Sequence, residues 1–323
     1  MGRVLTFGVV GLEDPNIEGW LELVASHPDC RLGPVWDPDP ERLGRTAERF
    51  GAEPAPGRPV GGRPVAGVDY VLHHPVAEAV IIGSAPAERR RWVERAVQAR
   101  KHWLVPGPFT PFIQTFEILY ARTREGGRAG LIAVPLLFEP TLVRAAELVR
   151  SGQVGRVLSV FGAYRVGRLA DLPWDPFVIP GLELFTYMVS AFGRPRRVYA
   201  EDNAGQVISV LGRLPDEGIL SLEFGRVLPP NIPVPAETLF EVVGETGAFR
   251  VDGLHRTVAL FGDGTEQPDG NPKAAVLEEF LRLTRTSDPA ERLRPLETVF
   301  AAYRVIEAAR RSLGTGQPVE VSW

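Results

Sequence analysis

A buried strand that ends abruptly at a Pro-Gly-Pro turn constrains the fold of this chain more than any other feature. The sequence predicts the strand over residues 101–105 and the turn over residues 106–108. Before it, residues 88–99 place apolar side chains at helical spacing. Residues 79–83 form a continuous apolar run, which is typical of a strand covered on both faces. Strand, helix and strand in this order predict a right-handed crossover within a parallel sheet.

The ends of the predicted strands indicate where a ligand would bind. Ligands of parallel sheets bind beyond the carboxyl ends of the strands, so we expect a site near Ser84 and Pro108. Gly11 follows a first strand over residues 4–10, and Asp37 follows a second. This pairing is the skeleton of a dinucleotide site, in which the glycine permits a tight turn and the aspartate binds ribose hydroxyls of NAD. The candidate cofactor is therefore NAD or NADP, and its candidate contacts are Gly11, Asp37, Ser84 and Pro108.

The rest of the glycine-rich fingerprint is missing. Glu13 and Asn16 stand where the second and third glycines of G-x-G-x-x-G are needed. We predict that Asp14 caps the following helix with Pro15 at its first position, which would occupy the N–H groups that a pyrophosphate uses. Two interpretations stay open. The loop is either a modified pyrophosphate site or a self-capped helix start that binds no cofactor.

Composition limits the classes of protein to which this chain can belong. With 323 residues, the chain is long enough for about two domains. Its net charge of −4, without runs of like charge, argues against nucleic acid or a membrane surface as partner. With no long apolar stretch and no signal-like start, we expect a soluble cytoplasmic protein. A single cysteine, Cys30, excludes an internal disulfide, and the pair His73–His74 lacks the further ligands that a metal site requires.

The second half of the chain changes character after a predicted strand over residues 131–138. Helices are predicted over 141–149 and 181–192, on either side of a strand over 157–166. Six short strands separated by turns then indicate a mostly antiparallel sheet. These strands are 197–201, 206–212, 218–224, 237–243, 248–251 and 257–261. We therefore expect an α/β protein with a Rossmann domain over 1–125 and an α+β domain over 126–323, which includes two C-terminal helices.

Five groups of residues resemble the glucose–fructose oxidoreductase and inositol dehydrogenase (Gfo/Idh/MocA) family. They are residues 35–42 with 47–52, 79–82 with 96–102, 151–157, 244–251 and 314–319. Together they span the chain. The resemblance implies a Rossmann domain followed by an α+β domain with an open, mostly antiparallel sheet. It also implies NAD(P)-dependent oxidation or reduction of sugars and polyols, and a homo-oligomer formed through the C-terminal sheet.

The catalytic positions of that family are all changed here. Its Glu-Lys-Pro after the fifth strand is replaced by residues 106–108, which puts Gly107 at the lysine position. The family's aspartate and the histidine four residues later align with Ile179 and Glu183. Its histidine before the fifth strand aligns with Arg89. Glu183 is therefore the candidate catalytic residue, as a base whose pKa burial would raise. The alternative is a carboxylate that stabilises the positive end of its helix.

The same resemblance gives candidate substrate contacts. Tyr164, Arg165 and Arg168 follow the first strand of the second domain, where relatives contact substrate, and Tyr187 lies on the later helix. The arginines could bind an anionic ligand bidentately, although alternation along an exposed strand predicts the same residues.

Three functions stay open: an NAD(P)-dependent oxidoreductase with a modified site and a sugar-like or other small ligand, a non-catalytic ligand-binding or regulatory relative, and a structural subunit.

Overall fold

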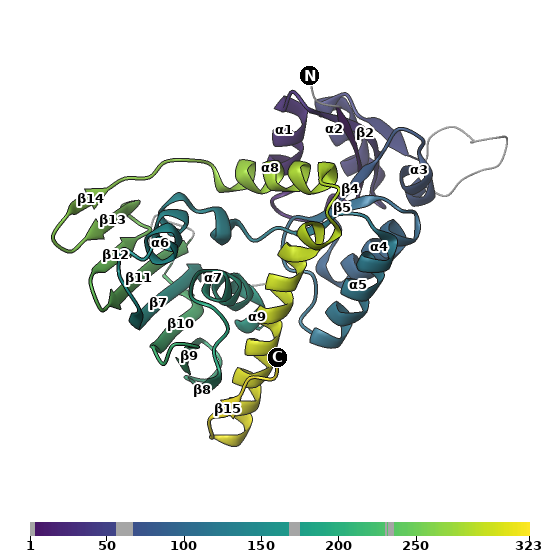
Figure 1. The fold of residues 1–323 in the computed structure, drawn as a ribbon. Coiled ribbons are helices and arrows are strands. Elements are labelled where there is room, and N and C mark those ends of the chain that lie inside the picture. The colour runs from purple at the N-terminus through teal and green to yellow at the C-terminus, as the bar shows by residue number, and fades with distance from the viewer. Residues whose placement is uncertain (1–3, 56–66, 168–174, 230, 232–235) are drawn as a thin grey trace. The chain divides into compact units, whose positions relative to one another are not determined.

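The computed structural model describes residues 4–55, 67–167, 175–229, 231 and 236–323 (Figure 1). Contacts divide the chain into two units. Unit 1 comprises Met1–Ala133 and Lys273–Glu297, and unit 2 comprises Val134–Pro272 and Thr298–Trp323. The predicted fold class is confirmed, because unit 1 holds a parallel sheet with helices and unit 2 holds a mixed, mostly antiparallel sheet.

Unit 1 is built on a six-stranded sheet in the order β3-β2-β1-β4-β5-β6, with all described pairings parallel. Its strands are β1 (Leu5–Val10), β2 (Cys30–Trp36), β3 (Glu53–Ala55), β4 (Ala79–Ile82), β5 (His102–Val105) and β6 (Gly130–Ile132). Its helices include α1 (Ile17–Ser26), α2 (Pro40–Phe50), α3 (Gly67–His73), α4 (Pro86–Gln98) and α5 (Ile113–Gly126). Every residue of β4 and β5 is buried, as their apolar runs predict.

Helix α2 begins and ends at the residues that its sequence predicts. The Asp39 carboxylate accepts N–H groups of Glu41 and Arg42, and Pro40 occupies the first helical position. Gly51 ends the helix with a φ of 61°, a left-handed conformation that glycine adopts without strain.

Helix α1 begins later than predicted. Its first residue is Ile17 and its N-cap is Asn16, so the prediction of Asp14 as the cap was wrong. The buried face of α1 follows from helical spacing, because side chains three or four residues apart point to the same side. This face consists of Ile17, Trp20, Leu21 and Val24.

One other boundary differs from the sequence-based expectation. The strand predicted over 131–138 stops at Ile132, and the chain turns into the 3₁₀ helix η1 (Pro135–Phe138). Helix α5 begins at Ile113, after a turn in which the Thr110 hydroxyl accepts the N–H of Phe112.

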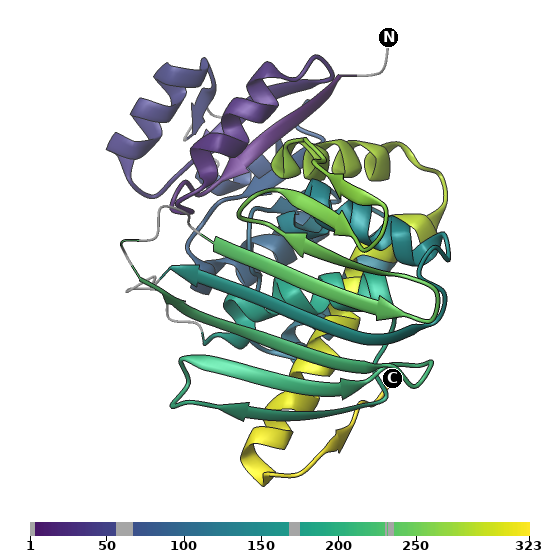
Figure 2. The same ribbon diagram turned by 90° about the vertical axis from the view of Figure 1, so that its left-hand side faces the viewer.

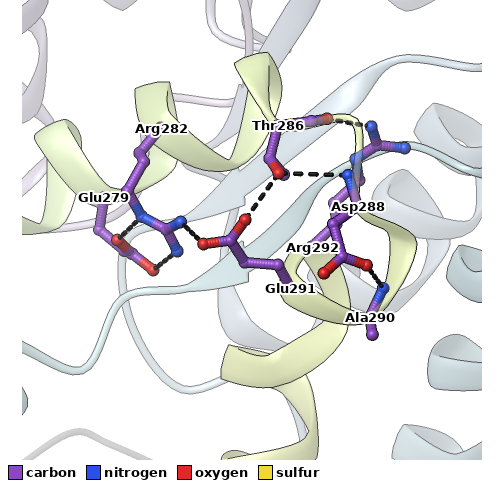
Figure 3. A network of polar contacts seen from close by, with 7 residues as sticks. All are labelled: Glu279, Arg282, Thr286, Asp288, Ala290, Glu291 and Arg292. Carbon is purple, nitrogen blue, oxygen red and sulfur yellow. Dashed lines mark hydrogen bonds and ion pairs between the residues drawn. The ribbon is translucent and has the colours of Figure 1, made fainter.

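Helix α8 (Pro272–Arg285) packs within unit 1, and α9 (Pro289–Thr315) follows it. The rings of Phe280 on α8 and Phe7 on β1 lie 5.7 Å apart. Figure 3 shows the junction between the two helices, where Arg282 joins Glu279 to Glu291. At the same junction the Asp288 carboxylate accepts the N–H of Ala290 at 2.9 Å, directly before a proline at the first position of α9. The Asp-Pro start seen in α2 therefore recurs.

Unit 2 is built on a nine-stranded sheet in the order β14-β13-β12-β11-β7-β10-β9-β8-β15. Strands β7 and β10 pair in parallel, and the other described pairings are antiparallel. The strands are β7 (Val157–Gly167), β8 (Arg197–Asp202), β9 (Val207–Arg213), β10 (Ile219–Leu228), β11 (Ala236–Gly244), β12 (Ala248–Asp252), β13 (Thr257–Leu260), β14 (Gly264–Glu266) and β15 (Val319–Glu320). Helices α6 (Pro140–Arg150) and α7 (Leu182–Phe192) belong to this unit, and a π-helical turn η2 (Phe177–Gly181) precedes α7.

One face of this sheet packs against helices, and the other faces the viewer in Figure 2. Behind the sheet, aromatic rings of α7 meet those of the strands, with Tyr187 5.0 Å from Phe240 and Phe185 5.4 Å from Phe224. Leu211, Ile219 and Val243 are exposed apolar residues of β9, β10 and β11. An oligomer formed through this sheet stays a prediction. Of the described helices, none combines the length and apolarity needed to span a membrane.

His102 shows how burial sets protonation in the core of unit 1. Its ring is buried at the start of β5, and its Nδ1 accepts the N–H of Ala129 at 2.9 Å. Burial, together with the nearby cations Arg128 and Arg292, lowers the pKa of His102 from 6.5 to about 4. The folded protein therefore keeps this ring neutral at pH values where an unfolded histidine is protonated.

We expect acid to destabilise the protein partly through His102. Between pH 6.5 and about 4 the unfolded state binds this proton and the folded state does not, so the free energy of unfolding decreases as pH falls. The loss should approach about 3 kcal/mol at pH 4, from about 1.4 kcal/mol per pKa unit. Urea denaturation of the wild type and His102→Asn at several pH values measures it. Parallel pH profiles of the two proteins would contradict the prediction.

Candidate active site

The loop between β1 and α1, where a dinucleotide pyrophosphate is expected, uses its own N–H groups internally. From residue 11 to residue 17 every backbone N–H group donates a hydrogen bond to an acceptor within unit 1. Pro15 has no N–H group. The acceptors are Trp36 O for Gly11, Asp37 Oδ2 for Leu12, Gly83 O for Glu13 and Asp14, Asp14 Oδ1 for Asn16, and Asp14 O for Ile17. These bonds are 2.6 to 3.0 Å long. A phosphate at this loop would have to replace some of them.

The two carboxylates of the loop are also engaged. Glu13 accepts the N–H of Ala85, just before α4, at 2.9 Å. Asp14 forms a buried ion pair with Arg89 of α4, and both side chains are about 95% or more buried. Burial lowers the pKa of the Arg89 guanidinium, and Asp14 opposes that effect. This pairing explains why Asp14 does not cap α1 as predicted.

Arg89 also fixes the loops that follow two other strands. Its guanidinium donates to Ser84 O at 3.2 Å and to Pro108 O at 2.6 Å. A Cβ atom at Gly107 would lie 3.4 Å from Arg89 Nη1. A lysine at position 107 would therefore start beside a buried cation. The glycine at the family's lysine position and the arginine at its histidine position thus fit each other.

Asp37 lies at the end of β2, as predicted, and its carboxylate is fully buried. One oxygen accepts the N–H of Leu12 at 2.6 Å. The other accepts the N–H of Asp39 at 2.8 Å and the Nε of Arg42 at 3.0 Å. Ribose hydroxyls would compete with these partners, so the cofactor role of Asp37 stays a prediction.

Gly11 and Ser84 are brought together at the ends of β1 and β4. Gly11 has a φ of 80°, and a Cβ there would lie 2.5 Å from Ser84 Cα. Glycine is thus required by the backbone and by this contact, whether or not a nucleotide binds. The Ser84 Oγ is buried and has no hydrogen-bond partner among the described residues.

These observations test whether the residues fit a dinucleotide. The partnerless Ser84 hydroxyl is compatible with a ligand at this edge of the sheet. The β1–α1 loop does not fit a pyrophosphate in the described conformation, because its donors are occupied and it adds two carboxylates. The sequence predicted that the loop's N–H groups are occupied but missed Arg89 as the partner of Asp14, since the two residues are 75 positions apart along the chain.

In unit 2, Glu183 lies in the first turn of α7, where the resemblance implies a catalytic residue. Burial raises the pKa of Glu183 from 4.5 to about 7, and a hydrogen bond from the backbone N–H of Leu136 opposes the rise. Tyr164 of β7 lies within electrostatic range of this carboxyl group, and burial together with the Glu183 charge raises the tyrosine pKa well above 10. The structure thus brings two predicted site residues together. Their roles in a reaction stay predictions.

The other predicted substrate residues lie elsewhere. Arg165 follows Tyr164 on β7, so its side chain points to the opposite face of the sheet, where it pairs with Glu223 and Glu237 at 2.8 Å. Tyr187 is buried and its hydroxyl donates to Leu142 O at 3.0 Å, which explains it as a core residue. Arg168 lies outside the described residues. Ile179, at the family's aspartate position, lies in η2.

Sequence reasoning missed Glu139. This residue is the N-cap position of α6 directly after η1, and its side chain does not cap the helix. Burial raises the pKa of Glu139, and Arg256 opposes the rise. The Glu139 charge also acts on Tyr164. The signal that could have found it is a Glu-Pro helix start in which the carboxylate has no capping role.

The adjacent histidines His73 and His74 do not form a metal site with the described residues around them. His73 ends α3, 3.9 Å from Asp69, and His74 lies 3.5 Å from Glu53. Within the described ranges no group of three or more His, Cys, Asp or Glu residues could hold a metal ion.

Comparisons with known proteins point to the class of oxidoreductases. The chain is 23% identical to an uncharacterised oxidoreductase of Rhizobium meliloti over 99% of its own length and 92% of the relative's. It is 25% identical to the dTDP-3,4-didehydro-2,6-dideoxy-α-D-glucose 3-reductase of Actinomadura kijaniata, over 49% of this chain and 45% of that enzyme. No family model matches the chain.

Two solved structures share the whole fold. GenD2 from gentamicin A biosynthesis, in complex with NAD, superimposes with a TM-score of 0.78 at 20% identity, covering 100% of this chain and 98% of GenD2. The WlbA dehydrogenase of Bordetella pertussis, in complex with NADH and UDP-GlcNAcA, gives 0.78 at 16% identity, covering 99% and 100%. The chain therefore has the two-domain fold that its resemblance to the Gfo/Idh/MocA family implies.

The Asp14–Arg89 pair should be important for stability. We expect Asp14→Asn to lower the free energy of unfolding by roughly 3 kcal/mol, because it leaves a buried guanidinium without its counter-charge. Glu48→Gln, which changes an exposed carboxylate of α2, should change it by less than about 0.5 kcal/mol. Urea denaturation of both variants measures the difference. Equal stability of Asp14→Asn and wild type would show that the pair is not needed.

Proposed function

We propose that this protein is an NAD(P)-dependent oxidoreductase of the Gfo/Idh/MocA type with a modified active site, acting on a sugar-like or other small polar molecule. The observation that carries the proposal is Glu183. At the other replaced catalytic positions, Gly107 and Ile179 are not ionisable and Arg89 is held in its ion pair with Asp14, which leaves Glu183 as the candidate proton acceptor. Burial moves its pKa to about 7, which suits acid–base chemistry near neutral pH.

The comparisons support the class of reaction and the cofactor. The relatives similar in sequence are oxidoreductases, and one is a reductase of a nucleotide-linked sugar. Two proteins with the same fold were solved with NAD or NADH. A nicotinamide cofactor would supply hydride chemistry when bound.

The residues of this chain would handle the proton that accompanies such chemistry. When an alcohol is oxidised its hydroxyl proton must leave, and when a carbonyl is reduced its oxygen must gain one. A carboxyl group with a pKa of about 7 is present in both protonation states near neutral pH, so Glu183 could do either. The Tyr164 hydroxyl would stay protonated and could donate a hydrogen bond to the reacting oxygen.

Substitution of Glu183 tests this role. We expect Glu183→Gln to lower kcat for alcohol oxidation by about 10²- to 10⁴-fold, because it removes the proton acceptor. In the wild type, oxidation should become faster as pH rises through about 7, where Glu183 loses its proton. Turnover of NAD(H) and NADP(H) with a panel of polyols and aldoses measures both effects. A variant that keeps the wild-type rate and pH profile would exclude Glu183 as the base.

A second candidate function is a non-catalytic relative that binds a small ligand in a regulatory or structural role. The specific observation that favours it is the β1–α1 loop, whose N–H groups are occupied and whose carboxylates oppose a pyrophosphate. Absence of turnover across the panel, together with absence of cofactor binding, would support this candidate.

Cofactor binding separates the two candidates. In a fluorescence titration with NADH and NADPH, a dissociation constant below about 100 μM, equivalent to about 5.5 kcal/mol, supports the oxidoreductase. We expect Glu13→Gln to tighten binding roughly tenfold, since it removes one negative charge near the phosphates and keeps an acceptor for Ala85 N–H. Glu48→Gln serves as the control of equal charge change. Unchanged affinity in Glu13→Gln would show that this charge does not limit binding.

A further inference from the structure

The carboxylate of Asp14 lies at the start of α1 and bridges two donors from different elements of unit 1. Its Oδ1 accepts the backbone N–H of Asn16, the N-cap residue of α1, at 2.8 Å. Its Oδ2 accepts a hydrogen bond from Nη2 of Arg89 on α4. A backbone N–H group at a helix start, combined with a guanidinium group, is a donor set with which proteins bind phosphate. We call the place between these two donors the anion site.

Arg89 is buried at this site and depends on Asp14 for its counter-charge. The Arg89 side chain is 3% exposed, and it also donates to Ser84 O at 3.2 Å and to Pro108 O at 2.6 Å. These carbonyl groups hold the guanidinium in place but carry no net charge. Among the described residues, Asp14 is the one carboxylate that forms an ion pair with Arg89. A buried cation requires a counter-charge, and an external anion in the place of Asp14 would supply it as well.

Two further groups beside the anion site favour a negatively charged ligand. The Ser84 residue is 1% exposed, and its hydroxyl has no hydrogen-bond partner within the described ranges. Lys273 of α8 donates to Asn16 Oδ1 at 3.4 Å, which places a second cation at the start of α1. The Glu13 carboxylate opposes an anion here, although it already accepts a backbone N–H. The anion site therefore has more donors and cations than its internal carboxylate uses.

We propose that the Asp14 carboxylate closes a phosphate site formed by Arg89 and the N–H of Asn16, and that a pyrophosphate binds here only where Asp14 is displaced. The misfit of the loop to a pyrophosphate is then a property of its closed form. When the Asp14 side chain turns away, it releases the two donors together. The inference rests on the proposed function in taking a dinucleotide, and it adds that exchange of one anion for another limits the affinity.

Binding of inorganic pyrophosphate to the full chain tests the anion site without any turnover. In calorimetric titration at pH 7 and constant ionic strength, Asp14→Ala should bind pyrophosphate about 100-fold more tightly than the wild type, because it frees two donors and removes a charge. Glu13→Gln is the matched control, since it removes a neighbouring charge without releasing Arg89, and it should gain no more than about tenfold. The double variant Asp14→Ala/Arg89→Gln should lose the gain.

A second variant and a second measurement serve where Asp14→Ala does not fold. Asp14→Asn keeps the shape of the side chain and an acceptor for the N–H of Asn16, and it should gain about 30-fold in pyrophosphate affinity. Pyrophosphate should also raise the Tm of Asp14→Asn more than that of the wild type, compared with chloride at equal ionic strength. A ligand that binds the folded state stabilises it in proportion to its affinity.

Several results would overturn the anion site. They are equal pyrophosphate affinity in the wild type and the Asp14 variants, a gain no larger than that of Glu13→Gln, a gain that survives in the double variant, or no binding by any of these proteins. Failure of the proposed function looks different. Tight pyrophosphate binding by Asp14→Ala or Asp14→Asn, without NADH or NADPH binding or turnover in any variant, would leave the anion site in place and reject the oxidoreductase. Turnover with an NADH affinity that neither Asp14 variant changes would keep the oxidoreductase and reject the inference.

Discussion

The buried ion pair between Asp14 and Arg89 holds together the loops at the carboxyl ends of the strands of unit 1. Through Arg89 it connects the loops that follow β1, β4 and β5, because the same guanidinium also donates to Ser84 O and Pro108 O. In a parallel sheet these loops form the place where ligands bind. In this protein the Arg89 guanidinium and the Asp14 carboxylate lie between these loops. The departures from the family's pattern, Glu13, Asp14, Arg89 and Gly107, are therefore parts of one arrangement.

Local chemistry made much of the fold predictable. The buried face of α1, the Asp39-Pro40 start of α2 and the fully buried strands β4 and β5 all follow from spacing and from the residues at helix ends. Errors arose where a distant partner decided the outcome. Asp14 had the right chemistry for a helix cap, but a charge 75 positions away in the sequence takes its carboxylate. Packing of α8 against β1 through Phe280 and Phe7 also depends on residues far apart in the sequence.

The site could be predicted in part for the same reason. The resemblance to a family placed Glu183 at a helix start, and the structure shows it half-buried in the first turn of α7. Because side chains alternate along a strand, the neighbours Tyr164 and Arg165 point to opposite faces of the sheet. The sequence does not reveal which of the two faces carries the site. Glu139 escaped notice because its Glu-Pro helix start does not reveal which distant residues fold beside it. Its importance comes from Tyr164 and η1, which fold beside it.

The contact between Gly11 and Ser84 bears on how glycine fingerprints are interpreted in sequences. A side chain at position 11 would collide with the backbone of Ser84, in the loop that follows β4. The close approach of the loops after β1 and β4 therefore requires glycine at position 11. A chain that had ceased to bind nucleotides would still be unable to replace this residue without moving two strands apart. The first glycine of such a motif therefore indicates the architecture of the sheet. The residues after it indicate whether the loop can still bind a phosphate.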